Sequence, residues 1–276
     1  MATYIKAVLA PNNTIVITPS KMASGGGEKA VEEYNDEFNK FTLSREKKRK
    51  QFRHQSQQFP YRKYLVDFIE QTCKSKGYSR STLFLATYLL DLYMDHHSLL
   101  IRRLMIVAIA SLTMAAKVEE RSATVPKFLE LMPEPVENAL KYYSEIQKEM
   151  LKFFEWDLFI PTAAHHIAYF MQALVTVDEK NYYNFPNLTQ CMGYVMGLYQ
   201  DNLLKDVHLM QCTSPSKLAA ALIASCRLRF GLSAWNNKLK HLSKYKESDF
   251  QETLTLVKQG TRLFSCINCY ERFTYR

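Results

Sequence analysis

The segment from Leu104 to Ala116 is apolar at every position except Ser111 and Thr113, which are both small. A helix formed by this segment would have no polar face, so it must be surrounded by other protein or by lipid. The segment has 13 residues, whereas a helix that crosses a bilayer needs about 20. The sequence therefore predicts a short, fully buried helix at the centre of a helical bundle, and no membrane span.

The segments around this central helix have the spacing of amphipathic helices. From Tyr61 to Ile69, apolar side chains recur at intervals of three and four residues, which is typical of a helix that packs on one side. Pro60 can open this helix, Gly77 can end it, and Ser81 can cap the next one. We expect five helices in this half of the chain, at about 60–76, 82–95, 102–117, 125–132 and 136–156.

After Pro161 the helical pattern begins again, and the small-residue run 217–225 predicts a second buried helix. Three short segments of the first half resemble segments of the second half in the same order, which is typical of an internal repeat: 65–69 and 167–171, 92–93 and 198–199, and 108–111 and 222–225. We expect further helices at about 162–176, 187–203, 215–230, 235–243 and 247–264. The pattern predicts an all-α fold of two tandem five-helix bundles with an N-terminal helical extension.

The two ends of the chain look different from the bundles. Clusters of Pro, Asn, Ser and Gly in residues 1–27 predict a flexible tail, in which Thr14–Thr18 is at best a short isolated strand. A mostly polar helix is expected from Glu28 to about Lys40. The expected divisions are a tail at 1–27, an N-terminal helix and basic segment at 28–54, the first bundle at 55–160, the second bundle at 161–265, and a short C-terminal tail at 266–276.

Positive charge is concentrated in one segment. The chain has a formal net charge of +9 at pH 7, of which residues 45–53 contribute +5 and the other 267 residues only +4. Such a cluster can be a nuclear localisation signal, a nucleic-acid contact or a solvated helix face. A folded nucleic-acid-binding protein more often spreads positive charge over a surface, so nucleic acid is not the expected partner. The candidate localisation residues are Arg45, Lys47, Lys48, Arg49 and Lys50.

Residues that could carry catalysis or bind a metal are sparse. The pairs His96–His97 and His165–His166 are adjacent in sequence, and neighbouring side chains on a helix point about 100° apart, so neither pair matches an H-x-x-x-H metal motif. Cys266 and Cys269 form a lone C-x-x-C, and hydrolase, P-loop and kinase motifs are absent. The N-terminus lacks the apolar run of a signal peptide. We expect an intracellular protein, in the nucleus and/or cytoplasm, that is not an enzyme and needs no metal or cofactor.

Short motifs on the predicted helices resemble those of a known family. YRKYLVDF at 61–68 resembles the M-R-x-I-L-V-D-W motif that opens a cyclin box, and LATYLLD at 85–91 resembles the L-A-x-x-Y-x-D motif of cyclins. AAKVEE at 115–120 is close to A-S-K-x-E-E, and LKFFEWDL at 151–158 is close to L-x-x-L-x-F/W-x-L. PTAAH at 161–165 opens the second half much as J-type cyclins do. Over about residues 55–265 the chain thus resembles the cyclin family, and within it the J-type cyclins.

This resemblance implies a non-catalytic regulatory subunit that binds and activates a cyclin-dependent serine/threonine kinase in cell-cycle control. Arg62 and Asp91 would form an ion pair between the first two helices of the first box. Lys117 would face the regulatory helix of the kinase, beside a position that is glutamate in most cyclins and is Gln147 here. Gln147 can accept a hydrogen bond from Lys117 but supplies no charge, which implies weaker binding or an unusual kinase. The implied kinase contacts are Lys117, Gln147, Met114, Val118, Leu151 and Trp156.

The resemblance also implies a second surface and leaves two other roles open. In several cyclins the first box helix exposes an apolar patch that recruits R-x-L peptides of substrate or inhibitor proteins. The matching residues here are Tyr61, Tyr64, Leu65 and Phe68, of which the last two can equally be core residues. One alternative role is that of a TFIIB-like transcription factor, which would carry basic DNA-binding surfaces on its repeats. The other is a cyclin-fold scaffold without kinase binding, for which Gln147 is the hint.

Overall fold

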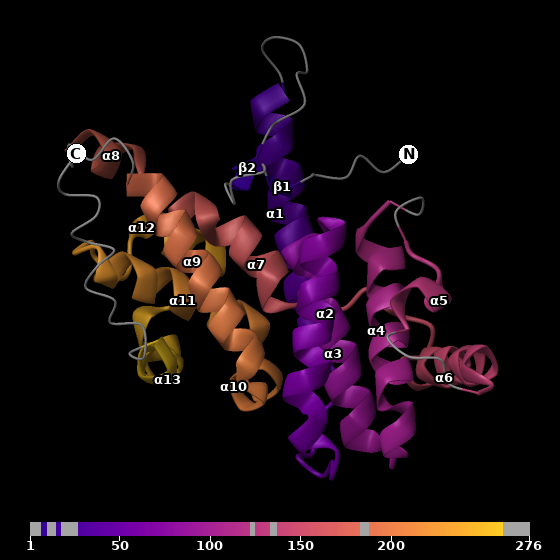
Figure 1. Ribbon diagram of the computed structural model, residues 1–276. Helices are drawn as coiled ribbons and strands as arrows, with labels where there is room; N and C mark the ends of the chain where they lie inside the picture. The colour runs from indigo at the N-terminus through magenta and orange to yellow at the C-terminus, as the bar shows by residue number, and fades with distance from the viewer. Residues whose placement is uncertain are drawn as a thin grey trace, which may run out of the picture.

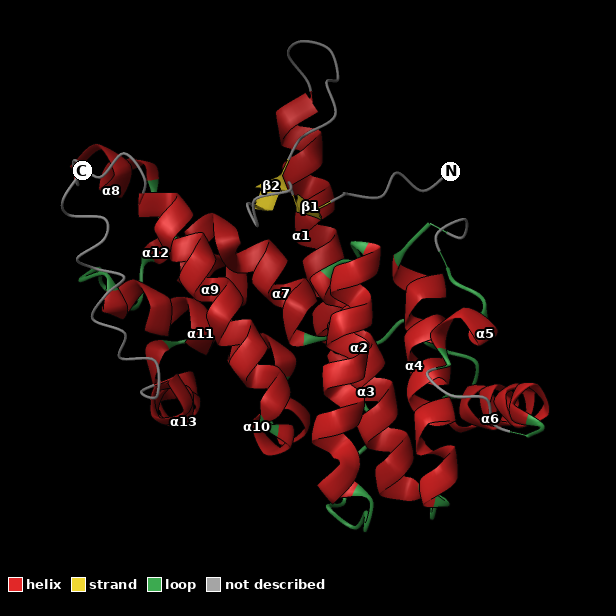
Figure 2. Cartoon of the chain, in the orientation of Figure 1, coloured by secondary structure: helices red, strands yellow, loops and turns green. Residues whose placement is uncertain are grey.

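The computed structural model describes residues 7–9, 15–17, 27–121, 125–132, 137–182 and 188–261. Most of the predicted N-terminal tail, the whole predicted tail at 266–276 and the Cys266–Cys269 pair lie outside the described residues. Nearly all regular structure in the described ranges is helical (Figure 2), so the predicted all-α class is confirmed. None of the described helices combines the length and the apolar character that crossing a membrane requires.

The first bundle is built around α4, the helix that has no polar face in sequence. Leu104 and all residues from Ile106 to Ala116 are buried, which confirms the predicted hub. Helices α2, α3 and α4 lie side by side, and α6 packs across α4 on the opposite side from α2 and α3 (Figure 1). In the described part of this bundle the five α-helices are α2 (Arg62–Lys76), α3 (Arg80–His96), α4 (Leu104–Glu119), α5 (Phe128–Leu131) and α6 (Ala139–Phe153).

The ends of the first two helices follow local sequence signals, with one correction. Gly77 ends α2 in the left-handed conformation with a φ of 67°, which glycine adopts without a steric penalty. The next helix begins at Arg80 and is capped by Ser79, whose hydroxyl oxygen accepts a hydrogen bond from the Thr82 amide at 3.2 Å. The prediction that Ser81 caps this helix was wrong, because Ser81 already lies within its first turn.

The second bundle repeats this arrangement around α11. Every residue from Leu218 to Arg227 is buried, so the second predicted hub is confirmed, and the paired segments seen in sequence fall on α2 and α7, α3 and α9, and α4 and α11. Among the residues described here, the five predicted helices are present, and two short ones, α8 and α10, are added to them. The helices are α7 (Ala163–Phe170), α8 (Val177–Tyr182), α9 (Leu188–Lys205), α10 (Val207–Cys212), α11 (Pro215–Arg229), α12 (Asn237–Ser243) and α13 (Gln251–Thr261).

The N-terminal helix α1 (Gly27–Glu46) is longer than the sequence predicted and packs on the second bundle. Its final turns are held by tertiary contacts that local propensity does not contain. The Asn39 side-chain amide donates to the Leu242 carbonyl oxygen at 3.0 Å. At the end of α1, the Glu46 carboxylate accepts hydrogen bonds from the backbone amide and the hydroxyl of Ser216, both at 3.0 Å, and so caps the N-terminus of α11.

Two short strands precede α1 in the chain. Ala7–Leu9 (β1) and Ile15–Ile17 (β2) form an antiparallel pair in which Val8 lies opposite Val16. The sequence predicted at most an isolated strand at 14–18, so this pairing is a correction. A strand needs a partner for its backbone N–H and C=O groups, and the matching apolar segment at 7–9 supplies one.

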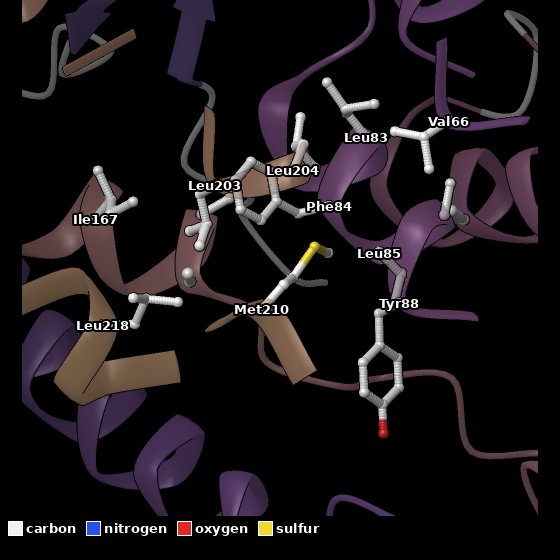
Figure 3. Close-up of a cluster of buried hydrophobic side chains, with 14 of the residues drawn as sticks. Val66, Leu83, Phe84, Leu85, Tyr88, Ile167, Leu203, Leu204, Met210 and Leu218 are labelled. Carbon is white, nitrogen blue, oxygen red and sulfur yellow. The ribbon is translucent and has the colours of Figure 1, made fainter. Parts of the chain in front are cut away.

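The two bundles share a continuous apolar core. Figure 3 shows the ring of Phe84 from α3 beside Leu203 and Leu204 from α9, with Met210 of α10 close by. Phe84 is fully buried, and the other three are at least nine-tenths buried. Helix α10 also packs against α3 (Figure 1). Because each bundle covers apolar surface of the other, the relative position of the two is fixed by the same hydrophobic packing that stabilises each one.

Candidate functional site

A buried ion pair lies where the two bundles meet. The guanidinium of Arg62 donates to both carboxylate oxygens of Asp91, at 2.7 and 2.9 Å, and both residues are almost completely buried. The remaining terminal nitrogen of Arg62 donates to the carbonyl oxygens of Leu204 at 2.9 Å and Lys205 at 3.4 Å, at the end of α9. This end of α9 carries the negative end of its helix dipole. The resemblance implied this ion pair within the first bundle. Through its bonds to the end of α9, the pair also joins the first bundle to the second.

The network continues from Asp91 to the segment that precedes the first bundle. The side-chain amide of Gln211 on α10 donates to Asp91 at 2.8 Å, and its oxygen accepts a hydrogen bond from Arg49 at 3.3 Å. The Arg49 guanidinium lies over the ring of Tyr88, 4.4 Å from the ring centroid. Burial lowers the pKa of Arg49, yet the aromatic face and the amide oxygen compensate for part of its lost hydration. One chain of polar contacts thus connects three regions of the sequence.

Other residues of the basic segment also make tertiary contacts. Arg45 forms an ion pair with Asp157 and donates to the Phe159 carbonyl oxygen at 2.9 Å, while Lys50 pairs with Glu155 at 2.8 Å. Lys47 and Lys48 are exposed. The basic segment is therefore largely attached to the surface of the protein, and nuclear import through it stays a prediction.

The candidate kinase-binding residues lie on α4, on α6 and just beyond α6. Lys117 is exposed near the end of α4 and has no hydrogen-bond or ion-pair partner among the described residues. The half-buried Gln147 donates from its side-chain amide to the Tyr143 hydroxyl at 2.7 Å and to the Thr113 hydroxyl at 3.3 Å. The implied hydrogen bond from Lys117 to Gln147 is not among the contacts of the structure, and Lys117 is left available for a partner.

The apolar residues of this group differ in exposure. Met114 is buried and belongs to the core, whereas Val118 and Leu151 are half-buried. Trp156 is 69% exposed, an unusual position for a residue of this size. The chain reverses after α6 through two residues of positive φ, Glu155 at 57° and Trp156 at 60°. This conformation is uncommon for non-glycine residues, and the indole in this turn lies on the surface.

The predicted peptide-docking patch on α2 is only partly a surface. Tyr61 is 41% and Tyr64 is 63% exposed, so two aromatic rings are available. Phe68 is half-buried. Leu65 is 2% exposed and packs in the core, so the prediction that it belongs to a docking surface was wrong. A leucine on the inward stripe of an amphipathic helix packs against its neighbours.

The paired histidines have structural roles at helix ends. The Nδ1 atoms of His96 and His97 lie 3.0 Å from the carbonyl oxygens of Leu92 and Tyr93, one turn earlier. His165 lies in the first turn of α7, with its Nε2 atom 3.0 Å from a Glu119 carboxylate oxygen. The Nε2 atom of His166 lies 3.1 Å from a Glu46 carboxylate oxygen.

A different group of residues was missed by sequence reasoning. His54, His208 and Cys212 offer three ligand atoms that all lie within 4.8 Å of one another, and all three residues are exposed. The His-x-x-x-Cys spacing at 208–212 puts two of them on one face of a helix, which was a usable signal. His54 lies more than 150 residues earlier and could be added only from the structure.

Family comparisons agree with this geometry. The family described as Cyclin, N-terminal domain, matches residues 36–159, and the family described as Cyclin, C-terminal domain, matches residues 161–262. The chain belongs to the cyclin family. The first match covers the second half of α1 and the first bundle, and the second match covers the second bundle. Each bundle is therefore a cyclin box.

Curated relatives of this cyclin include Cyclin-J proteins. It is 31% identical over 205 residues to Cyclin-J of Xenopus laevis and 32% identical over 202 residues to Cyclin-J of Homo sapiens, in each case over 70% of this chain. The matches cover 53% and 52% of those relatives, so this cyclin spans about half of their length.

Two solved structures share the fold at low sequence identity. A viral cyclin from herpesvirus saimiri matches with a TM-score of 0.53 and 17% identity, over 74% of this chain and 85% of the other. The yeast RNA Pol II CTD kinase CTDK-1 complex contributes a chain that matches with a TM-score of 0.55 and 16% identity, over 83% and 73%. These likenesses confirm the cyclin fold.

Proposed function

We propose that this cyclin is a non-catalytic regulatory subunit that binds and activates a cyclin-dependent protein kinase. The observation that carries the proposal is the pair of exposed side chains at the α4–α6 side of the first box, Lys117 and Trp156. A large exposed aromatic ring such as that of Trp156 is typical of interaction surfaces, and Lys117 has no partner among the described residues. Lys117 also matches the lysine that the family motif assigns to the kinase interface.

The proposed mechanism is a shift between two kinase conformations. A protein kinase needs an ion pair between its β3 lysine and the glutamate of its regulatory helix before phosphoryl transfer. A partner that binds only the conformation in which this helix is turned inward raises the population of the active state. In this cyclin, Trp156 and the half-buried Val118 and Leu151 would provide apolar contact, and Lys117 would donate hydrogen bonds to the kinase helix.

The shared core and the polar network support this role. A population shift can be only as large as the difference in binding free energy between the two kinase states. A rigid cyclin surface keeps that difference large, because a flexible surface could adapt to both kinase conformations. The ion pair between Arg62 and Asp91, extended to α9 and α10, fixes the helices behind the proposed surface.

The proposal is tested by affinity purification of the tagged protein from the cells that express it. The normal protein is compared with Lys117→Ala and with Lys240→Ala, which removes an equally exposed lysine from α12 of the second box. We expect a cyclin-dependent kinase to co-purify with the normal protein and with Lys240→Ala, and to be lost with Lys117→Ala. A folded protein that retains no kinase would overturn the proposal.

The scaffold alternative is favoured by one observation, the neutral side chain of Gln147 and its hydrogen bonds within the protein. In that case other proteins, and no kinase, would co-purify with the normal protein and with both variants. The TFIIB-like alternative needs accessible basic residues on the repeats, whereas much of the basic segment is engaged by the two boxes. Binding of the protein to DNA that weakens steeply as the salt concentration rises would favour the TFIIB-like role.

A further inference from the structure

We propose that His54, His208 and Cys212 form a binding site for a divalent metal ion of the zinc class. The ligand atoms of these residues lie within 4.8 Å of one another, and the His54 Nε2 atom is 3.0 Å from the Cys212 sulfur. Imidazole nitrogen and thiolate sulfur are the ligands that zinc prefers, at about 2.0–2.1 Å and 2.3 Å from the metal. Small side-chain rotations would bring all three onto one ion. This proposal departs from the sequence-based expectation of no metal site.

Two of the ligands come from one turn of helix α10. His208 and Cys212 are four residues apart, so their side chains project from the same face of the helix. Spacing of this kind is what allows two residues of one helix to hold a single ion. The third ligand, His54, approaches from the segment before the first box, and its ring lies 5.2 Å from that of His208.

The position of His54 is set by the surrounding structure. Its backbone has a φ of 57°, a conformation that a residue with a Cβ adopts rarely. The buried carboxylate of Asp95 accepts hydrogen bonds from the backbone amides on both sides, those of Arg53 and Gln55. The ring of Phe52 packs edge-on against the imidazole, with centroids 4.6 Å apart. His54 is thus preorganised, which reduces the entropy lost when a ligand binds.

Two carboxylates lie near the site, and a groove beside it leaves room for a fourth ligand. Burial first, and then the negative charges of Asp95 and Asp206, raise the pKa of the Cys212 thiol, and the same two charges attract a positive ion. Cys212 lies in the wall of a groove of about 570 Å³ between residues 46–52 and 211–215. Zinc in proteins is commonly four-coordinate, so water or a ligand from a partner protein would complete the shell.

A metal at this site would join the segment before the first box to the second box. It would tie residues 53–55 to α10, close to the Arg62–Asp91 network that Gln211 of the same helix already contacts. An ion that binds only the folded state raises the stability of that state. The site is separate from the α4–α6 surface proposed for the kinase, so its existence does not depend on kinase binding.

The test is titration of the tag-free full-length protein with Co²⁺, which substitutes for zinc and reports on its ligands. The protein carries Cys266→Ser and Cys269→Ser so that these two thiols do not contribute. We expect one equivalent of Co²⁺ to give visible ligand-field bands and a sulfur-to-cobalt charge-transfer band, both displaced by Zn²⁺. Zn²⁺ should also raise the thermal unfolding temperature.

Three variants each remove one ligand, and one variant is the control. Metal binding should weaken by more than about 100-fold in each of Cys212→Ser, His208→Ala and His54→Asn. Loss of a residue that only supports a metal ligand has a smaller effect. Asparagine is chosen because it tolerates the left-handed conformation of His54.

His241→Ala is the control, because it removes an exposed histidine of α12, and it should bind metal as the parent does. Without metal, all variants should unfold at the temperature of the parent, since the ligands are exposed. No charge-transfer band, or binding that survives Cys212→Ser, would overturn the proposal.

Discussion

The carboxylate of Asp91 and the guanidinium of Arg62 face each other in a bidentate pair, with N–O distances of 2.7 and 2.9 Å. Neither charge is exposed to solvent to any useful extent. Such a pair gains little over well-packed apolar side chains, but loss of one partner leaves an isolated buried charge. The pair therefore specifies how α2, α3 and the end of α9 fit together, and its effect on stability is best measured by removing one side.

Replacement of Arg62 by methionine should lower the free energy of unfolding by about 3–5 kcal/mol, because Asp91 would remain buried without its cation. The measurement is urea denaturation followed by circular dichroism. Lys63→Met is the matched control, since Lys63 is the next residue and pairs with Asp67 on the surface, at 2.7 Å. An exposed pair of this kind adds little to stability. Equal losses for the two variants would contradict the assigned role of the buried pair.

Restoring the charge at position 147 should strengthen kinase binding. In Gln147→Glu the carboxylate can accept hydrogen bonds from the hydroxyls of Tyr143 and Thr113, which now receive them from the amide. A hydrogen bond to a charged group contributes roughly 1–3 kcal/mol, so affinity should rise by about 5- to 150-fold. Gln172→Glu places the same charge at an exposed site of the second box and should leave affinity unchanged in the same binding assay. A decrease with Gln147→Glu would refute this account of the interface.

Truncation of Trp156 should separate binding from stability. Because its side chain is 69% exposed, Trp156→Ala should change the free energy of unfolding by no more than about 0.5 kcal/mol. Exposed tryptophans that become buried in an interface often contribute about 2 kcal/mol or more to affinity. Calorimetric titration with the co-purified kinase should show this loss. Tyr194→Ala, which truncates another exposed aromatic residue on α9, should have no effect on affinity.

The ion pair between Glu179 and Arg227 predicts a pH dependence of stability. Hydrogen bonds from the buried Arg227, at 2.5 and 3.0 Å, outweigh burial and lower the pKa of Glu179 to about 2. A carboxyl group whose pKa is lower in the folded state contributes stability that is complete above its unfolded pKa, about 4.5, and is lost as the pH falls toward 2.

Denaturation curves between pH 5 and about pH 2 test this prediction. The difference in free energy of unfolding between the normal protein and Glu179→Gln should be largest at pH 5 and shrink through this range. Asp178→Asn removes a neighbouring carboxylate and serves as the control. A difference that stays constant with pH would show that Glu179 contributes through packing alone.

Much of the fold could be predicted from the sequence because its signals are local or periodic. The apolar segment at 104–116 predicted a buried hub, and the repeated helical pattern predicted two bundles. The end of α1 could not be predicted, because the helix continues to Glu46 through contacts with residues far along the chain. The capping position of α3 differs by two residues, since Ser79 and Ser81 are both good caps.

The candidate site was predictable only in part, because some of its features depend on contacts between distant parts of the chain. Family motifs gave Lys117, Gln147 and the Arg62–Asp91 pair. The role of Arg62 at the end of α9 depends on a contact across about 140 residues, which no local pattern contains. The exposure of Trp156 depends on a turn with two positive φ angles, and propensity alone would place a tryptophan in the core.

The central claim is activation, and it is tested most directly by kinase activity. A purified cyclin-dependent kinase that co-purifies with this protein is titrated with it, and phosphate transfer to a protein substrate is measured at each concentration. The account predicts a saturable rise in rate, and the same maximum at a higher concentration for Lys117→Ala. Saturable binding with no rise in phosphate transfer would contradict it, because the cyclin would then bind a kinase without favouring its active conformation.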